Sequence, residues 1–157
     1  MENGPKIVLV ADDDENLRTL YGEDLRDEGY QVILAQNGRE VIEAVEKVPI
    51  DLIILDIVMP VMDGIEALGR IIARHKDIPV ILYSAYPHYK DDFMSWAADA
   101  YLMKSSDLTE LKEMVRHLLQ KERKGSFKSA ITKREVQSNQ NQREGGQNPQ
   151  LQLLLLR

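Results

Sequence analysis

The chain has 157 residues, of which 43% are hydrophobic and 29% are charged, and this length and balance suit one globular domain rather than two. It contains no cysteine, which excludes a disulfide framework, thiolate chemistry and a cysteine-based zinc site. The net charge is −6, and residues 1–120 carry 12 Lys and Arg against 23 Asp and Glu. Because an acidic domain repels the phosphates of nucleic acids, no direct nucleic-acid partner is expected.

Strand-like and helix-like segments alternate along the chain. The expected strands are residues 6–11, 30–35, 52–55, 79–83 and 100–103, of which 30–35 alternates in the manner of an edge strand. Helices are expected after Asp12–Asp14 up to Gly29, from Asn37-Gly38, from Asp63, over about Lys90–Ala97 and from Asp107. Five such βα units in succession predict a parallel sheet with helices on both faces.

The stretch Asp51–Gly64 carries the central functional signal. Leu52–Leu55 is an uninterrupted apolar run, typical of a strand that is buried on both faces, and Asp56 follows it directly. Open α/β sheets bind their ligands at the carboxyl ends of their strands. Asp56 is therefore a candidate functional residue.

Further polar residues follow the other predicted strands, and the ends of parallel strands meet at one edge of the sheet. They are Asp12 and Asp13 after the first strand, Asp56 after the third, Ser84 after the fourth and Lys104 after the fifth. Three close carboxylates need a cation, and hard oxygen ligands favour Mg²⁺. Two acids that hold the metal leave the third as a nucleophile, and a hydroxyl and an ammonium suit a phosphoryl group. The pattern predicts metal-assisted phosphoryl transfer to a carboxylate.

Each of these residues also has a simpler explanation. Asp12–Asp14 could be turn and helix-capping residues, Ser84 a loop hydroxyl and Lys104 a solvated surface charge. Taken alone, each simpler explanation is favoured. Together they are not, because four strand ends carry the residue types that a single reaction needs.

Three motifs resemble the receiver domain of two-component response regulators, in particular the single-domain type of chemotaxis and phosphorelay pathways. They are Val8-Leu-Val-Ala-Asp12-Asp13-Asp14-Glu-Asn-Leu-Arg18, Leu55-Asp56-Ile-Val-Met-Pro60-Val-Met-Asp63-Gly64 and Asp99-Ala-Tyr101-Leu-Met-Lys104, within about residues 5–122. The resemblance implies a flavodoxin-like (βα)5 three-layer sandwich with the parallel strand order 2-1-3-4-5. It also implies a signalling module, rather than an enzyme, that accepts a phosphoryl group from a sensor histidine kinase or a phosphotransfer protein and uses Mg²⁺.

The same resemblance implies roles for individual residues. Asp56 would be the phospho-acceptor; Asp13 would bind Mg²⁺ directly, with Asp12, Asp56 and the backbone carbonyl of Val58 assisting. Ser84 matches the switch hydroxyl, Tyr101 the aromatic switch position and Lys104 the lysine that pairs with the phosphate.

Two features depart from the family pattern. The family usually follows the lysine with a cis proline, whereas Ser105 follows Lys104 here. Because a cis bond before a residue other than proline costs about 2.5–4 kcal/mol, we expect a trans bond. Val58 and Tyr86, each two residues beyond a site residue, offer little polar help to an attacking water, so slow self-dephosphorylation is expected.

Phosphorylation of Asp56 would add negative charge that draws Ser84 and Lys104 inward. The face formed by the fourth helix, the fifth strand and the last helix is then expected to change shape and to bind an unknown downstream protein. The candidate contacts there are Tyr86, Tyr89 and Trp96, although Trp96 equally suits packing on its own helix. The chain is expected to be a monomer or a weak dimer.

The composition changes from about Gly125, where polar residues without apolar periodicity begin. We interpret residues 125–157 as a disordered polar and basic tail after a receiver domain of residues 1–124. The N-terminus has no signal-peptide pattern, and no window is apolar enough to span a bilayer. A cytoplasmic location without a membrane partner is therefore expected.

Two other functions stay open at this point. Asp12-Asp13-Asp14 contains the Asp-x-Asp of haloacid dehalogenase-like phosphatases, in which the first acid would be the nucleophile, although the chain lacks room for a cap domain. The other alternative is a scaffold that binds partners without phosphorylation. The intact set of acids argues against that scaffold.

Overall fold

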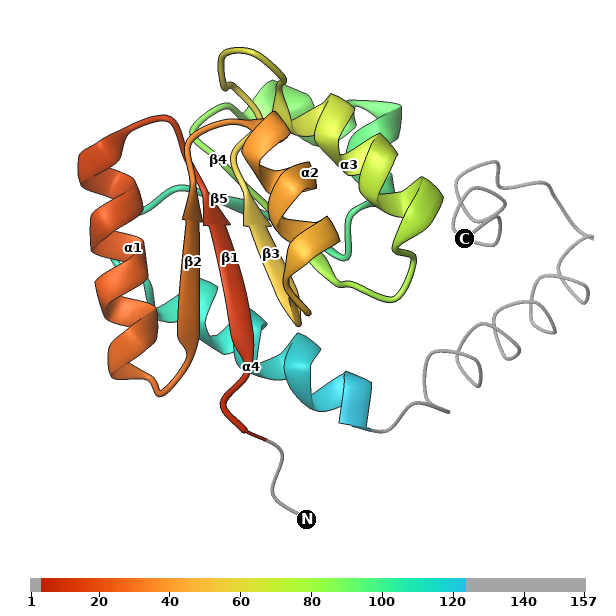
Figure 1. The fold of residues 1–157 in the computed structure, drawn as a ribbon. Helices are drawn as coiled ribbons and strands as arrows, with labels where there is room; N and C mark the ends of the chain where they lie inside the picture. The colour runs from red at the N-terminus through yellow and green to blue at the C-terminus, as the bar shows by residue number, and fades with distance from the viewer. Residues whose placement is uncertain (1–3, 124–157) are drawn as a thin grey trace, which may run out of the picture. The chain divides into compact units, whose positions relative to one another are not determined.

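A five-stranded parallel sheet lies at the centre of the fold in the computed structural model (Figure 1). Its strands are β1 (Ile7–Ala11), β2 (Gln31–Ala35), β3 (Leu52–Leu55), β4 (Val80–Ser84) and β5 (Ala100–Met103). They pair in the order β2-β1-β3-β4-β5, and every pair is parallel. This confirms the predicted strand order and the edge position of the second strand.

The structure describes residues 4–123, so the predicted tail, residues 125–157, lies outside the described residues. Of the described residues, 4–116 belong to one compact unit. Among the described residues, no helix combines the length and the apolar character that crossing a bilayer requires.

Helices cover both faces of the sheet in the described part of the chain. They are α1 (Glu15–Asp27), α2 (Gly38–Lys47), α3 (Gly64–Arg74), the 3₁₀ helices η1 (Pro87–Asp91) and η2 (Phe93–Ala97), and α4 (Thr109–Arg123). The helices α2, α3 and η2 pack on one face, whereas α1 and the first turns of α4 lie on the other (Figure 1). The result is the three-layer flavodoxin-like arrangement that the sequence predicted.

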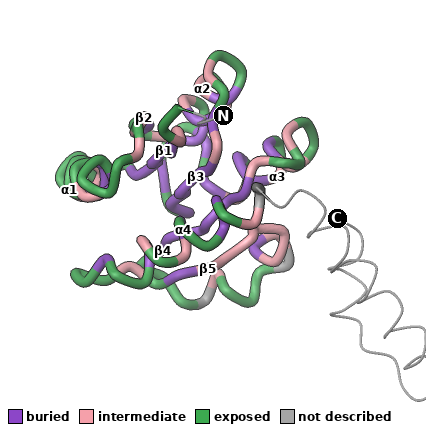
Figure 2. The backbone as a smooth tube through the Cα atoms, turned by 90° about the horizontal axis from the view of Figure 1, so that it is seen from below, coloured by how far each residue is buried: buried purple, intermediate pink, exposed green. Residues whose placement is uncertain are grey.

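The three central strands carry the buried core (Figure 2). Every residue of β3 and β4 is buried, as is every residue of β1 except the first. Since helices cover both faces, these strands have no solvent-facing side, and they are apolar except for Ser84 and the Tyr83 hydroxyl at the end of β4. Ser84 and the residues just beyond the ends of β1 and β3 are therefore the polar groups at this edge of the sheet.

Short polar motifs set the ends of the helices. The side chains of Asp14, Asn37 and Asp63 accept backbone N–H bonds from the first turns of α1, α2 and α3. Asp107 accepts the N–H of the first residue of α4 at 2.9 Å. Each N-cap of this kind contributes about 1 kcal/mol. Gly29, with φ of 97°, ends α1 in a conformation that favours glycine, as predicted.

The helix predicted over Lys90–Ala97 is wrong in type, because the structure has the two 3₁₀ helices η1 and η2 there. Asp92 separates them. Its backbone is extended, and its side chain accepts the N–H of Met94 at 2.9 Å, so Asp92 ends one turn and caps the next. Trp96 is half-buried, and its indole N–H donates to the Lys90 carbonyl at 3.1 Å, which favours packing within its own segment.

Candidate functional site

Three charged residues stand at the carboxyl edge of the sheet. Asp12, Asp56 and Lys104 are the first residues after β1, β3 and β5. The N–H of Asp56 donates to the Ala11 carbonyl at 3.0 Å, and the N–H of Lys104 donates to the Ser84 carbonyl at 2.8 Å. Because these bonds extend the ladders of the sheet, the sheet itself fixes where both side chains begin.

The acids lie close together, as the sequence predicted. One carboxylate oxygen from each of Asp12, Asp13 and Asp56 lies within 4.8 Å of the others. Asp12 is 1% exposed and Asp56 is 5% exposed, whereas Asp13 is open to solvent. Two carboxylates are thus withdrawn from water while the third reaches it, so an ion can enter from solvent.

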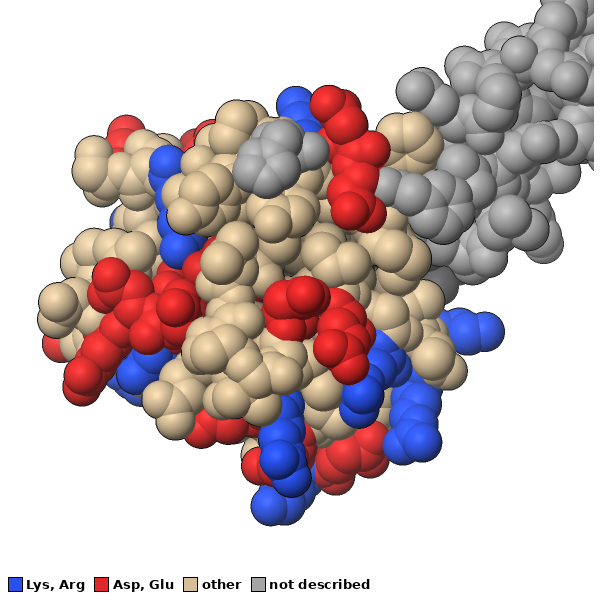
Figure 3. Space-filling model, turned by 90° about the horizontal axis from the view of Figure 1, so that it is seen from above, with Lys and Arg blue, Asp and Glu red and all other residues tan. Residues whose placement is uncertain are grey.

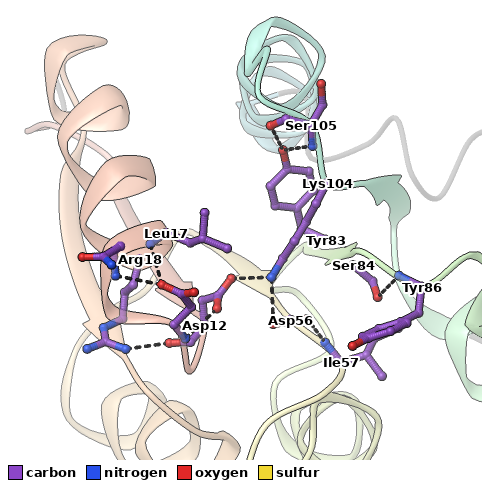
Figure 4. Close-up of polar contacts among 12 residues, drawn as sticks. Asp12, Leu17, Arg18, Asp56, Ile57, Tyr83, Ser84, Tyr86, Lys104 and Ser105 are labelled. Atoms are coloured by element: carbon purple, nitrogen blue, oxygen red, sulfur yellow. Dashed lines mark hydrogen bonds and ion pairs between the residues drawn. The ribbon is translucent and has the colours of Figure 1, made fainter.

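The ammonium of Lys104 bridges two of these acids (Figure 4). Its Nζ lies 2.7 Å from Oδ2 of Asp12 and 2.9 Å from Oδ2 of Asp56. The other oxygens accept backbone N–H groups, Asp12 Oδ1 from Asp14 at 2.9 Å and Asp56 Oδ1 from Ile57 at 2.8 Å. Both carboxylates are therefore fixed in orientation.

The charges of this cluster do not balance. Burial raises the pKa of Asp56 above its usual value, although Lys104 opposes the rise. Burial alone would lower the pKa of Lys104, but its hydrogen bonds to Asp12 and Asp56 outweigh that effect and raise it. With Asp13, three carboxylates share one ammonium, and one divalent cation would neutralise the remainder. A donor set made only of carboxylate oxygens suits Mg²⁺.

The same imbalance is visible on the surface. Figure 3 looks down on the edge toward which the strands of Figure 1 point, and acidic side chains gather across the middle of this face. Such a surface attracts cations and repels a free phosphate group. A cation bound at the acids would reduce this repulsion.

The residues next to Asp12 have structural roles. Asp14 accepts the N–H groups of Asn16 and Leu17 at 2.9 and 3.1 Å and caps α1, so the helix-capping explanation holds for it. Arg18, for which the sequence suggested no role, donates from Nη1 to the Asp12 carbonyl at 2.7 Å. This bond ties the loop that carries the acids to the first turn of α1.

Ser84, Tyr86 and Tyr101 form a hydrogen-bonded group at the end of β4. Ser84 is fully buried, and its Oγ accepts the N–H of Tyr86 at 3.1 Å (Figure 4). The hydroxyl of Tyr101 donates to the carbonyl of Tyr86 at 2.6 Å. The backbone of Tyr86 thus links the two side chains that were predicted to form the switch.

Gly64 packs directly against the backbone of Asp56. A Cβ atom at position 64 would overlap the carbonyl oxygen of Asp56 and would lie 2.9 Å from Cα of Ile57. The N–H of Gly64 also donates to the Ile57 carbonyl at 2.8 Å. The backbone of Gly64 therefore packs against the backbone of Asp56 and helps to fix its position. Only glycine permits the two backbones to come this close.

The peptide bond between Lys104 and Ser105 is trans, as expected, because residues 4–123 contain no cis peptide. The N–H of Ser105 donates to the hydroxyl of Tyr83 at 3.2 Å. Sequence reasoning missed Tyr83. The signal that could have found it is a tyrosine that follows an aliphatic run and directly precedes the site residue Ser84.

The loop between β3 and α3 carries the remaining predicted ligand. Val58 is 44% exposed, and the role of its carbonyl as a metal ligand stays a prediction. In the same loop, Val61 is 75% exposed and has φ of 68°, a conformation that a β-branched residue rarely adopts.

Comparisons with known proteins agree with this geometry. A model of the response regulator receiver domain matches residues 8–116. Response regulator RR06 of Streptococcus pneumoniae is 47% identical over 78 residues, which are 50% of this chain and 36% of that protein. Sporulation initiation phosphotransferase F of Bacillus subtilis is 33% identical over 114 residues, 71% of this chain and 92% of that protein. The match thus spans about a third of RR06 and nearly all of the phosphotransferase.

Solved structures give the same result. The response regulator TrrA of Thermotoga maritima, in complex with Mg²⁺-BeF, is 46% identical with a TM-score of 0.70, over 72% of this chain and 98% of that chain. TrrA in complex with the histidine kinase ThkA is also 46% identical with a TM-score of 0.69, over 73% of this chain and 98% of that chain. Both the family model and the solved structures identify receiver domains, which are phosphoryl-accepting switches. The chain belongs to the response regulator receiver domain family of two-component systems.

Proposed function

We propose that this receiver domain accepts a phosphoryl group on Asp56 from a histidine kinase or a phosphotransfer protein, with Mg²⁺ as cofactor. The observation that carries the proposal is the position of Lys104, whose Nζ lies between Asp12 and Asp56 at 2.7 and 2.9 Å. One site thereby joins a nucleophile, two further acids and a cation. TrrA, which is solved in complex with the histidine kinase ThkA, supports a kinase as the donor.

In this reaction Asp56 acts as the nucleophile. One of its carboxylate oxygens bonds to phosphorus, the bond from phosphorus to the donor's histidine nitrogen breaks, and the imidazole keeps that electron pair. Lys104 then transfers its contact from the carboxylate to a phosphoryl oxygen. A magnesium ion, held by Asp12 and Asp13 with the Val58 carbonyl as a further ligand, would supply charge neutralisation for the phosphoryl oxygens.

Ser84 and Tyr101 are proposed to transmit the conformational change from the phosphorylated Asp56 to the surface. In the present state the Oγ of Ser84 accepts the N–H of Tyr86. A phosphoryl group on Asp56 offers a stronger acceptor for the Ser84 hydroxyl, because charge-assisted hydrogen bonds are shorter and stronger. Rotation of Ser84 would loosen its bond to Tyr86, whose carbonyl is the partner of the Tyr101 hydroxyl. The loop after β4 and the ring of Tyr101 would therefore move together.

The downstream protein is proposed to bind where this movement emerges, on η1, η2, β5 and the start of α4. This is the face that the sequence described as fourth helix, fifth strand and last helix. Tyr86 and Met103 are 47% and 40% exposed there. Trp96 is a weaker candidate contact, since its indole N–H donates within its own segment.

Slow loss of the phosphoryl group is proposed as well. Val58 and Tyr86 are both exposed and follow Asp56 and Ser84 by two positions. A valine side chain has no polar atom with which to orient an attacking water, and this supports a long-lived acyl phosphate.

The domain would comprise residues 1–124, act in the cytoplasm, and be a monomer or a weak dimer. A helix that continues to Arg123 agrees with this boundary. Gel filtration before and after phosphorylation, together with cell fractionation, tests the last two points.

The test of the proposed function is intact-mass spectrometry after treatment with acetyl phosphate and Mg²⁺. The wild-type chain should gain the mass of one phosphoryl group, and this gain should disappear without Mg²⁺. Asp56→Asn should abolish the gain. If Asp56→Asn is labelled normally while Asp12→Asn is not, the nucleophile is Asp12, as in the phosphatase alternative, and the proposal fails. An unlabelled wild-type chain would favour the scaffold.

A further inference from the structure

Ser105 follows Lys104, whose ammonium reaches both buried acids, Asp12 and Asp56. The Lys104 side chain has several rotatable bonds, so the position of its ammonium depends on how firmly the backbone at residues 104 and 105 is held. Two contacts hold that backbone. They are made by Tyr83 and Ser84, which are consecutive residues of β4.

The first contact is ordinary sheet pairing. The N–H of Lys104 donates to the Ser84 carbonyl at 2.8 Å, which continues the β4–β5 ladder by one residue. The second contact is made by a side chain. The hydroxyl of Tyr83 accepts the N–H of Ser105 at 3.2 Å and faces the Ser105 carbonyl at 3.4 Å (Figure 4). The first of these two distances is that of a hydrogen bond, and the second is long.

The ring of Tyr83 is itself immobilised. Tyr83 is 3% exposed, and it packs edge-on against Tyr21 of α1, with ring centroids 5.3 Å apart and an interplanar angle of 66°. Burial raises the pKa of Tyr83, so its hydroxyl stays protonated at neutral pH. Buried aromatic packing on one side and a backbone contact on the other make Tyr83 a rigid spacer between α1 and residue 105.

The loop beyond this contact is also fixed. The Oγ of Ser105 accepts the N–H of Asp107 at 3.1 Å, and Asp107 in turn caps the start of α4. A proline at position 105 would provide neither the N–H for Tyr83 nor the hydroxyl for Asp107. The loop after Lys104 is therefore held by two hydrogen bonds of Ser105 that proline could not make.

We propose that Tyr83 is a positioning residue for phosphoryl transfer: its hydroxyl anchors the backbone of Ser105 and so holds the Lys104 ammonium at Asp12 and Asp56. The proposal rests on the proposed function, in which Lys104 stabilises the transferred group. Tyr83 touches none of the reacting atoms in this account. It acts only through Lys104, and this restriction makes the idea testable.

The test compares wild type, Tyr83→Phe, Lys104→Ala and the double variant Tyr83→Phe/Lys104→Ala. For each, the rate of labelling by acetyl phosphate at saturating Mg²⁺ is followed by intact mass, and the affinity for Mg²⁺ alone is measured by calorimetry. Tyr30→Phe, which removes the hydroxyl of a half-buried tyrosine just before β2, serves as the matched control.

Tyr83→Phe should slow labelling by about 3–10-fold, the effect of one lost hydrogen bond. Its affinity for Mg²⁺ should be equal to or tighter than that of wild type, because a displaced ammonium no longer competes with the cation for the acids. Lys104→Ala should also bind Mg²⁺ more tightly, and adding Tyr83→Phe to it should change neither measurement. Tyr30→Phe should match wild type.

Any other result of these measurements would overturn the inference. An unchanged labelling rate in Tyr83→Phe would mean that the hydroxyl does not position Lys104. Slower labelling together with weaker Mg²⁺ binding would indicate general damage to the site, as would a further change on top of Lys104→Ala. A wild-type chain that is not labelled at all would overturn the proposed function instead, while the Mg²⁺ affinities would still decide the placement of Lys104.

Discussion

The Nζ atom of Lys104 lies 2.9 Å from Oδ2 of Asp56, although 48 positions separate the two residues in the chain. The sheet brings them together, since each stands at the carboxyl end of a strand. Both side chains are largely shielded from solvent, and they belong to a cluster that has more carboxylates than cations.

Replacement of Lys104 by Met should destabilise the protein at neutral pH when Mg²⁺ is absent. Asp12 and Asp56 would be left as buried carboxylates without a cation, and removal of one partner from a buried pair costs about 3–5 kcal/mol. Because the Lys104 side chain is 15% exposed, we expect the lower end of this range. Urea unfolding measures the effect, and Mg²⁺ should restore part of the loss.

Lys112→Met is the matched control for this prediction. Lys112 pairs with Asp24 at 3.1 Å and Glu28 at 3.6 Å in a more exposed setting. Water and salt screen exposed pairs strongly, so this variant should lose little stability and should not respond to Mg²⁺. Equal losses in the two lysine variants would contradict the account.

Asp56→Asn should make the protein more stable at neutral pH without Mg²⁺. Burial raises the pKa of Asp56 in the folded state, so the folded protein favours the protonated acid. Below the unfolded pKa both states are protonated and Asp56 costs nothing. As the pH rises through the folded pKa, the buried carboxylate must ionise and stability is lost. Unfolding curves should therefore show that the variant has a larger free energy of unfolding than wild type at neutral pH. This difference should disappear in acid.

The opposite result would be informative. If Asp56→Asn is less stable than wild type at neutral pH, the pair with Lys104 outweighs the burial of the carboxylate. The proposed need for a divalent cation would then lose its electrostatic basis.

Gly64→Ala should displace Asp56 and impair labelling. The new methyl group would overlap the Asp56 carbonyl oxygen, and overpacking of this kind costs about 1–3 kcal/mol. Gly69→Ala is the control, because its Cβ would meet only Cε of Met94 at the ordinary contact distance of 3.5 Å. That variant should be neutral or more stable by up to about 1 kcal/mol, with unchanged labelling. Normal labelling of Gly64→Ala would disprove the support that Gly64 is argued to give.

Val61→Asn should stabilise the protein by about 1 kcal/mol. The backbone of Val61 has φ of 68°, which costs an L-residue about 1–2 kcal/mol and which asparagine tolerates better. Val58→Asn, in the same exposed loop but without a positive φ, should give no such gain. Thermal unfolding of the two variants decides the matter, and an equal shift in both would refute the explanation by backbone strain.

The phosphorylated wild-type chain should lose its phosphoryl group over many minutes or longer. Val58→Asn should shorten this lifetime, because an amide beside Asp56 can orient the attacking water. The decay of the phosphorylated species is followed by intact mass after the phosphodonor is removed. A wild-type lifetime of seconds would show that Val58 and Tyr86 do not have the expected effect.

Much of this architecture was predictable because it depends on local patterns. The apolar run Leu52–Leu55 marked a buried strand, and polar caps such as Asn37 and Asp63 marked helix starts within a residue. The convergence of Asp12 and Asp56 followed from topology alone, since parallel strands end at one edge. These features need no knowledge of side-chain packing.

Other features depend on contacts between distant segments and were not predictable. Nothing local to Tyr83 indicates that its hydroxyl meets Ser105, 22 positions later. The segment Lys90–Ala97 has helix-like spacing, but the backbone of Asp92 is extended and its side chain accepts the N–H of Met94, so two 3₁₀ helices stand where one helix was expected. The positive φ of Val61 likewise contradicts the preference of valine.

The most direct test of the central claim is to locate the modified residue. After treatment with acetyl phosphate and Mg²⁺, reduction with borohydride converts a phosphorylated aspartate to homoserine, which peptide sequencing by mass spectrometry can place. We predict that homoserine appears at position 56 and depends on Mg²⁺. Homoserine at position 12 or 13, with Asp56 unchanged, would contradict the account.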